Sequence, residues 1–388
     1  MDLSYILNQL GEEHESYFNA VSPPIIQTSN FLFESVDEMR KAFAAEYDVF
    51  LYSRGNNPTV EILKEKIAAL DGAEDALVFN SGASAIFCAV LPFVKSGDHI
   101  VSVKAPYTWA QRMFEVILPR FGVSHTYIDG TDIAHWEAAT QANTVLYYLE
   151  SPNSWTYELQ DLAAVAALAK SRNIVTIIDN SYCTPLYQRP LDFGIDLSLQ
   201  SATKYLGGHS DTVAGVLSGS KAHIEKIFYS EYMTTGAGAT PFHAWLLLRG
   251  LRTLPIRLER VTRTTHAMVA WLRQQPWVES VIFPMDEDFP QQALAKKQMQ
   301  NACGLLTLHV KANTVNQIET FCNSLQRFRM AVSWGGHESL VIPKCAGMPR
   351  DDFDAENPVH RQIRMYVGLE ETDVLCNDLQ QAAINASM

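Results

Sequence analysis

The chain has 388 residues, of which 47% are hydrophobic and 19% are charged, with 20 glycines and 17 prolines. This composition is typical of a globular protein and excludes disordered, collagen-like and coiled-coil chains. The formal net charge is -13 and no basic run stands out. The sequence therefore disfavours nucleic acid and anionic membranes as partners, because both require a concentrated positive patch.

The length, the cysteines and the N-terminus add further expectations. A single core stops growing at about this length, so we expect one larger and one smaller domain. The six cysteines are scattered without a CxxC pair, which indicates reduced thiols. No basic N-terminal segment precedes an apolar run, and about 18 consecutive apolar residues occur nowhere, so we expect a soluble cytoplasmic protein.

From about residue 45 onward, short apolar runs alternate with amphipathic helical patterns, as in βαβ units. The helical pattern at 59–70 repeats apolar residues at spacings of three and four. The apolar runs read as strands that are covered on both faces, and they lie at 76–79, 99–103, 144–149, 174–178 and 197–200. These patterns predict an α/β fold with a mostly parallel, doubly wound sheet.

The character of the chain changes near residues 245–260, where a long helical pattern begins. The strands after it, such as the one in GLLTLHV (304–310), are less continuously apolar. We therefore predict an N-terminal arm (1–45), a large domain (46–245) and a smaller α+β C-terminal domain (246–388).

Ligands of open α/β sheets bind beyond the carboxyl ends of the strands, so the residues just after each apolar run are candidates for a site. Ser81, Gly82 and Ala83 follow the first strand and begin a helix, where free N–H groups and the helix dipole suit a phosphate. An ordinary N-cap by Ser81 accounts for the same segment equally well.

Asp179 follows the fourth of these strands and Lys204 follows the fifth, with hydroxyls at Ser201 and Thr203. A buried carboxylate is costly unless a cation or donor meets it, and burial lowers the pKa of a lysine towards the range in which it is nucleophilic. Alone, such a lysine is most often a surface charge. Together these groups match what pyridoxal 5'-phosphate (PLP) requires: a Schiff-base lysine, a carboxylate for the pyridine nitrogen, and donors for the phosphate.

The sequence resembles the Cys/Met metabolism family of PLP-dependent enzymes, which includes cystathionine synthases and lyases, methionine γ-lyase and the sulfhydrylases. The resemblance covers nearly the whole chain and implies the fold-type I PLP-dependent transferase architecture. It rests on these segments: 52–59 (YSRGNNPT), 81–83 (SGA), 179–180 (DN), 201–205 (SATKY), 208–211 (GHSD), 241–245 (PFHAW), 249–251 (RGL), 333–340 (SWGGHESL) and 363–370 (IRMYVGLE).

The resemblance implies roles for matching positions in the cofactor site. Lys204 corresponds to the Schiff-base lysine and Asp179 to the partner of the pyridine nitrogen. The phosphate ligands correspond to Ser81, Gly82, Ala83, Ser201 and Thr203. Tyr52 and Arg54 resemble the pair that reaches the phosphate of a neighbouring subunit, which implies a homotetramer of two dimers with shared active sites. A guanidinium suits this task because it binds phosphate bidentately.

Two further positions bear on the substrate. Tyr107 lies where the family places a tyrosine that stacks on the cofactor ring and can carry a proton near the reacting carbon. The local sequence differs from the family's Tyr-Gly-Gly-Thr run, and a core tyrosine is the alternative. Arg364 resembles the residue that binds the α-carboxylate of the amino-acid substrate.

Details within the family point in two directions. Two segments are similar to bacterial cystathionine β-lyases: ESPNSWT (150–156), which contains Ser154, and SWGG (333–336), which contains Ser333 and Trp334. We expect Ser154, Ser333 and Trp334 to contact substrate. Trp334 as a mere wall of the pocket is the alternative. GNNPT (55–59) resembles the γ-synthases and γ-lyases instead.

We therefore predict a carbon–sulfur lyase of methionine biosynthesis that converts cystathionine to homocysteine, pyruvate and ammonia, with Lys204 removing the α-proton. Cystathionine γ-synthase, cystathionine or methionine γ-lyase and O-acetylhomoserine sulfhydrylase are the alternatives within the family.

Other function classes fit the sequence less well. Residues 236–241 lack the third glycine of a dinucleotide loop, His337-Glu338 does not continue as HExxH, and residues 208–212 lack the second glycine of GxSxG. The other histidines are scattered, so we expect no metal. A non-catalytic PLP-binding regulatory protein is a further alternative, although such a protein has no need of Arg364.

Overall fold

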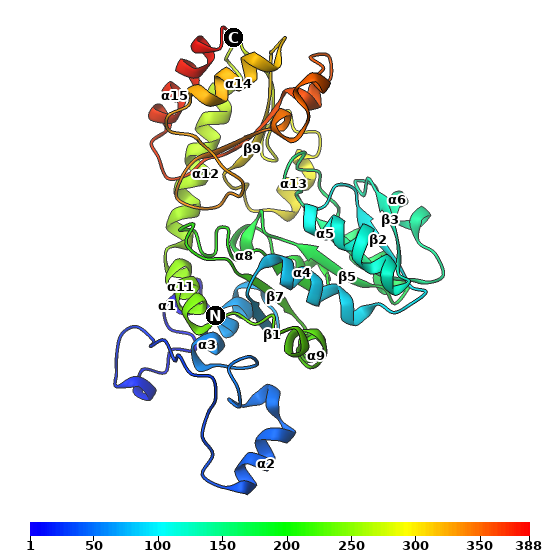
Figure 1. Ribbon diagram of the computed structural model, residues 1–388, viewed down its shortest axis with the longest axis vertical. Coiled ribbons are helices and arrows are strands. Elements are labelled where there is room, and N and C mark those ends of the chain that lie inside the picture. Colours follow the sequence, from blue (N-terminus) through cyan, green and yellow to red (C-terminus); the bar gives the residue numbers. More distant parts are fainter. The chain divides into compact units, whose positions relative to one another are not determined.

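The computed structural model describes residues 1–388 and divides them into two compact units, each with its own sheet (Figure 1). The first unit comprises Met1–Ser151, Leu159–Gly207 and Asp211–Thr253, and the second comprises Pro152–Glu158, Gly208–Ser210 and Leu254–Met388. The domain limit expected after residue 245 falls inside helix α11 (Pro241–Arg252), which belongs wholly to the first unit because it packs on α3 (Pro58–Asp71).

The sheet of the first unit has seven strands in the order β1-β7-β6-β5-β4-β2-β3. All neighbours are parallel except β7, which runs antiparallel to β1 and β6. The mostly parallel sheet expected from the sequence is confirmed, and the five expected strands occur within one residue of their limits. The strands are β1 (Asp75–Phe79), β2 (His99–Val103), β3 (Ser124–Ile128), β4 (Thr144–Glu150), β5 (Val175–Asp179), β6 (Leu197–Gln200) and β7 (Gly215–Gly219).

Helices cover both faces of this sheet, which explains why its strands are apolar throughout. Successive side chains of a strand point to opposite faces. Leu146 and Tyr148 of β4 accordingly join one apolar cluster with residues of α4 (Gly82–Val90), whereas Leu149 joins another with residues of α7 (Leu162–Ser171). The other helices of the unit are α5 (Thr108–Arg112), α6 (Ile133–Ala139), α8 (Thr184–Tyr187), α9 (Lys221–Ile227) and α10 (Met233–Thr235), with π-helical turns at Met113–Ile117 and Phe228–Tyr232.

Helix α3 follows the local rules for helix ends and confirms the helix expected at 59–70. The side chain of Asn57 accepts the Thr59 N–H at 3.0 Å, Pro58 occupies the first turn, and Gly72 ends the helix with a φ of 70°. The helix also fixes the start of the chain, because the buried ammonium of Lys66 bonds to the carbonyl oxygen of Ile6 at 2.9 Å.

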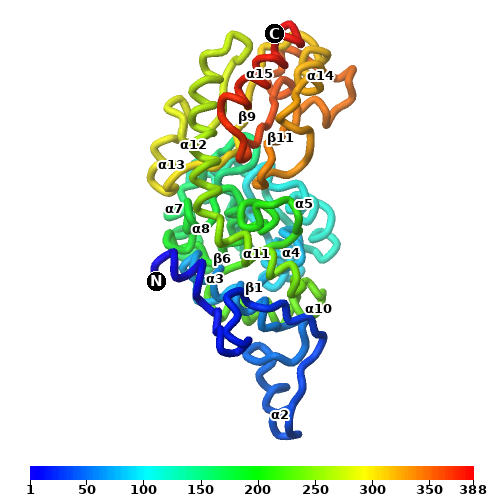
Figure 2. The backbone as a smooth tube through the Cα atoms, turned by 90° about the vertical axis from the view of Figure 1, so that its left-hand side faces the viewer, coloured from blue at the N-terminus to red at the C-terminus, as the bar shows by residue number.

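The segment after α1 (Leu3–Asn8) is unusually exposed for its composition. Phe18 and Leu32 are 99% and 97% exposed, and α2 (Val36–Ala44) projects from the rest of the first unit (Figure 2). Apolar side chains at this degree of exposure are typical of a surface that another chain covers.

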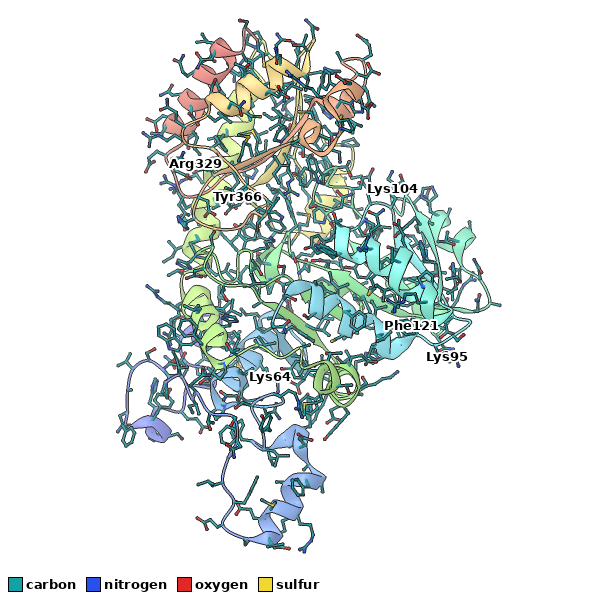
Figure 3. All side chains as sticks on the ribbon, viewed as in Figure 1. Lys64, Lys95, Lys104, Phe121, Arg329 and Tyr366 are labelled. Atoms are coloured by element: carbon teal, nitrogen blue, oxygen red, sulfur yellow. The ribbon has the colours of Figure 1, made fainter.

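The second unit is a smaller α+β arrangement, as the sequence predicts. Its sheet has the order β10-β11-β12-β9-β8 and is antiparallel except between β10 and β11; Arg329 on β10 and Tyr366 on β12 are labelled in Figure 3. The strands are β8 (Val278–Ile282), β9 (Leu305–Val310), β10 (Arg329–Met330), β11 (Leu340–Pro343) and β12 (Gln362–Tyr366). The helices are α12 (Leu254–Leu272), α13 (Gln292–Gln298), α14 (Val315–Ser324) and α15 (Thr372–Asn385). Across both units, none of the helices combines the length and apolar character that a membrane crossing requires.

Candidate active site

The carboxyl ends of β5 and β6 lie side by side, because these strands are parallel neighbours and Asp179 pairs with Leu199. A hydrogen bond joins the two segments that leave these strand ends: the Ser201 N–H donates to the Ser181 hydroxyl oxygen at 2.6 Å. The Lys204 N–H in turn donates to the Ser201 carbonyl at 3.0 Å. The strand-end residues singled out in the sequence are thus held in one place within the first unit.

Asp179 is an unusual carboxyl group because only 8% of the residue is exposed. Its Oδ1 accepts the Ser181 N–H at 2.9 Å, and the side chain of Ser181 also bonds to the carboxylate. Burial raises the pKa of Asp179, while the Ser181 hydrogen bonds and the charge of Lys204 act in the opposite direction. A protonated ring nitrogen placed against this carboxylate would stabilise its buried charge.

The start of α4 offers a cradle for a phosphate. A Cβ at Gly82 would lie 3.0 Å from the Cβ and 3.1 Å from the Oγ of Ser201, so glycine allows the helix its close approach to the β6 end. Ser81 caps the helix by accepting the Ser84 N–H at 3.1 Å. The N–H groups of Gly82 and Ala83 have no partner within the helix and can bind an anion. The cap and the phosphate site are therefore compatible.

Thr203 is placed close to these groups, but its hydroxyl is engaged elsewhere. It donates to the carbonyl oxygen of Ala214 at 3.2 Å and accepts the Ala214 N–H at 3.0 Å. For Thr203 to donate to a phosphate, its hydroxyl would have to turn away from Ala214. Ser201 carries no such constraint and is the better fit of the two hydroxyls.

Tyr107 immediately precedes α5 and is 44% exposed, which argues against a core tyrosine. Its N–H donates to Oε2 of the buried Glu150 at 2.7 Å. Burial, and then the charges of Asp179 and Glu150, raise the pKa of the Tyr107 phenol. Sequence reasoning missed Glu150, although a carboxylate at the end of an apolar strand was a signal for it.

Tyr52 and Arg54 belong to the N-terminal part of the first unit. Both are exposed, and the Arg54 guanidinium carbon lies 5.3 Å from the centroid of the Tyr52 ring. The Arg54 backbone lies beside Gly238, which pairs with Phe79 at the end of β1, but neither the Tyr52 nor the Arg54 side chain bonds to the predicted phosphate ligands of its own chain.

The predicted substrate residues belong to the second unit. Arg364 lies on β12 and is 9% exposed, and its guanidinium donates to the carbonyl oxygen of Ser154 at 3.5 Å. The Arg364 guanidinium carbon also lies 5.1 Å from the ring centroid of Trp155, a residue that sequence reasoning did not single out. Ser333 has a φ of 83°, and its neighbour Trp334 is buried.

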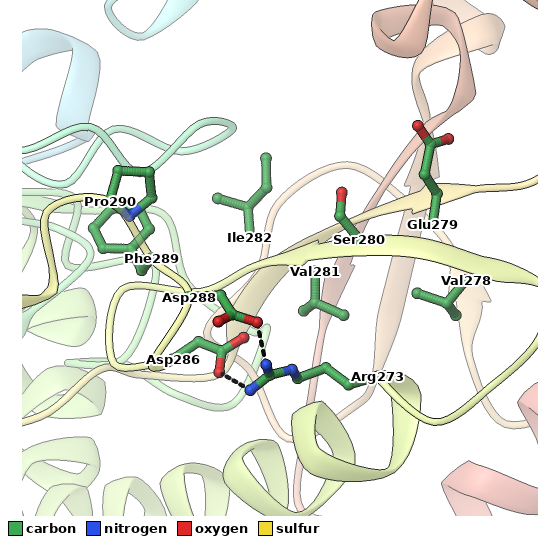
Figure 4. Close-up of a pocket in the computed structure, with 10 residues that line it drawn as sticks. All are labelled: Arg273, Val278, Glu279, Ser280, Val281, Ile282, Asp286, Asp288, Phe289 and Pro290. Carbon is green, nitrogen blue, oxygen red and sulfur yellow. Dashed lines mark hydrogen bonds and ion pairs between the residues drawn. The ribbon is translucent and has the colours of Figure 1, made fainter.

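A separate cavity of about 440 Å³ lies in the second unit along β8 (Figure 4). Its cation, Arg273, binds Asp286 at 2.8 Å and also binds Asp288. Since these carboxylates already neutralise the guanidinium, the cavity offers no free positive charge for a substrate carboxylate. It also contains none of the predicted site residues.

The strand-end residues of the first unit fit PLP. The glycine cradle with two helix N–H groups suits its phosphate, the carboxylate of Asp179 suits its ring nitrogen, and Lys204 provides an amine.

Comparisons with known proteins agree with this geometry. The model of the family described as Cys/Met metabolism PLP-dependent enzyme matches residues 6–383. The chain is 37% identical over 373 residues to L-methionine gamma-lyase of Treponema denticola. This alignment covers 94% of the chain and 92% of the relative. It is 34% identical over 379 residues to cystathionine gamma-lyase of Homo sapiens, with coverages of 96% and 91%. The chain therefore belongs to the Cys/Met metabolism family of enzymes that depend on pyridoxal 5'-phosphate.

Proposed function

We propose that the protein is a carbon–sulfur lyase that eliminates a thiol from the side chain of a sulfur amino acid. The arrangement of Asp179, Lys204 and the Gly82 cradle at adjacent strand ends carries this proposal. PLP supplies an electron sink that stabilises negative charge at the substrate α-carbon. The residues of the chain then have to bind, orient and move protons around that carbon.

Each residue has a defined task in this proposal. The freed amine of Lys204 takes the α-proton, and Asp179 holds the positive charge on the ring nitrogen. Ser201 and the N–H groups of Gly82 and Ala83 bind the phosphate. Because its pKa is raised, Tyr107 keeps its proton and acts as a donor towards the departing sulfur or the cofactor, not as a base.

Elimination at the γ-carbon is the reaction that the relatives support, since those reported above carry the names methionine and cystathionine gamma-lyase. The segment GNNPT (55–59) favours the same side of the family. A γ-elimination requires a second proton removal at the β-carbon, which Lys204 can perform after the first.

Elimination at the β-carbon of cystathionine is the second candidate, and the observation that favours it is Trp334. Ser154 supports it less. Arg364 bonds to the backbone carbonyl of Ser154, a group that every residue type has, and not to the serine hydroxyl. Arg364 is proposed to bind the α-carboxylate for either reaction.

The product distinguishes the two reactions. With L-methionine or L-cystathionine, γ-elimination yields 2-oxobutyrate and ammonia, whereas β-elimination of cystathionine yields pyruvate. We expect 2-oxobutyrate by chromatography of the keto acids, and no turnover by Lys204→Ala. Pyruvate from cystathionine without 2-oxobutyrate would assign the β-reaction, and absence of both would refute the lyase proposal.

We also propose that two copies of the chain share active sites. The exposure of Tyr52, Arg54 and the apolar side chains at Phe18 and Leu32 supports this, because a second copy would bury them. Arg54 would then reach the phosphate of the partner, as the family resemblance implies.

A further inference from the structure

The loop Pro152–Glu158 of the second unit is locked into one shape by a single side chain. Oδ1 of Asn153 accepts the N–H groups of Trp155 at 3.0 Å, Thr156 at 2.9 Å and Tyr157 at 3.1 Å. The hydroxyl of Thr307 on β9 also donates to the Trp155 carbonyl at 2.9 Å. These bonds fix the backbone from which the Trp155 indole projects.

Two cations lie against this indole. The Nζ of Lys344 is 4.4 Å from the ring centroid and the guanidinium carbon of Arg364 is 5.1 Å from it. Arg364 pairs with Ile342 across the β11–β12 ladder, and Lys344 begins the 3-10 turn Lys344–Gly347 that directly follows β11. Trp155 therefore contacts both cations, and the charge of Arg364 is close enough to lower the pKa of Lys344.

No carboxylate accompanies Lys344. Burial and the Arg364 charge lower its pKa, and no acid raises it. The nearby acids have other partners: Glu158 of the same loop accepts from Asn153, and Glu319 binds Arg350 at 2.9 Å. By contrast, Arg273 of the same unit is surrounded by carboxylates (Figure 4). Two like charges on one aromatic ring repel each other unless an anion joins them.

We propose that Lys344 and Arg364, supported by the Trp155 indole, form a two-cation site that binds the carboxylate of the amino-acid substrate. The planar guanidinium of Arg364 matches both carboxylate oxygens, and the ammonium of Lys344 adds a point charge from the side. The identification of the bound anion as a substrate carboxylate rests on the proposed function. Lys344 is a substrate-binding residue that no motif in the sequence marks.

A non-reacting carboxylate tests the site directly. The probe is 3-(methylsulfanyl)propanoate, which lacks the amino group, and its neutral amide is the control; binding to the PLP-loaded protein is measured by calorimetry. We expect Lys344→Met to weaken binding of the acid about 10-fold and Lys344→Arg to restore it, with no change for the amide. Equal binding of the acid to the original protein and to Lys344→Met would overturn the proposal.

The pH dependence separates a charge effect from a packing effect. The turn at Lys344 packs against β11, β12 and the turn Pro358–Arg361. The charged or titratable groups of these elements are Arg364, Tyr366, His360 and Arg361, and the charge of Arg364 is the one that lowers the pKa of Lys344. The ammonium is therefore lost at lower pH than in a free lysine, whereas Lys344→Arg stays charged. At low pH the original protein should bind the acid more tightly than Lys344→Met does, and we expect this difference in affinity to shrink as pH rises. The difference in affinity between Lys344→Arg and Lys344→Met should persist. A difference in affinity between the original protein and Lys344→Met that does not change with pH would contradict the proposal.

Kinetics provide a second variant-based measurement. Lys344→Met should raise KM for methionine and cystathionine alike by about 10-fold with less effect on kcat, because the lost contact acts in binding. An effect confined to cystathionine would place Lys344 at the side chain of the substrate and refute the shared carboxylate site. If the lyase assay fails but the acid still binds through Lys344, the proposed function falls and this site stands.

Discussion

The Ser201 N–H donates to the hydroxyl oxygen of Ser181 at 2.6 Å, and this bond ties the segment that carries Lys204 to the segment that carries Asp179. Ser181 also donates its own N–H to Asp179. One short side chain thus controls the spacing between the expected amine and the expected acid of the cofactor site.

Removing that hydroxyl should loosen the cofactor site. Ser181→Ala leaves the Ser201 N–H without its partner, which costs about 1 to 3 kcal/mol when the group stays buried. We expect about 10-fold weaker PLP binding, measured by titration of the cofactor absorbance. Ser171→Ala is the control and should bind PLP normally, because Ser171 is exposed and its hydroxyl bonds to the Leu168 carbonyl within α7. Equal affinity in both variants would show that the bond does not matter.

The Gly82 cradle predicts a steric effect. In Gly82→Ala the new Cβ would lie 3.0 Å from the Ser201 Cβ, so Ser201 or the start of α4 must give way by a few tenths of an ångström. We expect the fold to persist and PLP affinity to fall by about 10-fold, since the N–H donors and the Ser201 hydroxyl no longer align with the phosphate. At Gly347 a Cβ meets no atom within 4 Å, so Gly347→Ala should leave PLP affinity unchanged.

Asp179→Asn should separate cofactor binding from turnover. The amide keeps the size of the side chain but cannot hold a positive charge on the ring nitrogen, so stabilisation at the α-carbon is lost. We expect PLP to remain bound, seen by its absorbance, and kcat to fall by about 100-fold or more. An unchanged kcat would exclude Asp179 as the ring-nitrogen partner.

Asp71 predicts a pH dependence of stability. Burial raises its pKa from 3.8 to about 7, although it accepts bonds from Ser218 at 2.7 Å and from Gln200. The folded state then holds the proton more tightly than the unfolded state, so stability present below pH 3.8 is lost as pH rises through about 7.

We expect Asp71→Asn to lose less stability than the original protein over this pH range. The thermal midpoint of the variant minus that of the original protein should therefore rise by several degrees between pH 5 and pH 8, which corresponds to about 1 to 2 kcal/mol. Asp351→Asn, at an exposed carboxylate, should track the original protein at each pH. A parallel decline in Asp71→Asn would place the proton elsewhere.

Sharing of sites between copies predicts complementation. Arg54→Ala and Lys204→Ala should each be nearly inactive alone. Co-refolded in equal amounts, they should recover about a quarter of the original activity, because half of the dimers are hybrids and each hybrid holds one complete site. Absence of recovery, with hybrid dimers demonstrated by differential tagging, would show that Arg54 acts within its own chain.

Much of the first unit could be predicted from local patterns. The limits of β2 and β6 follow from apolar runs, because a strand covered on both faces has no polar alternation. Two strands were missed for physical reasons: β3 is a partly exposed edge strand with polar residues, and β7 begins and ends with glycine. The antiparallel placement of β7 between β1 and β6 has no local signal at all.

The sequence by itself determined the strand-end chemistry, since Asp179 and Lys204 stand out wherever a parallel sheet brings carboxyl ends to one edge. The tertiary structure decided which groups surround them. The bond from Tyr107 to Glu150 and the gathering of Lys344 and Arg364 on Trp155 join positions far apart in the chain. Such contacts depend on strand register and on how a loop packs over a sheet, and these are set by the summed packing of both units' cores and not by any local run of residues.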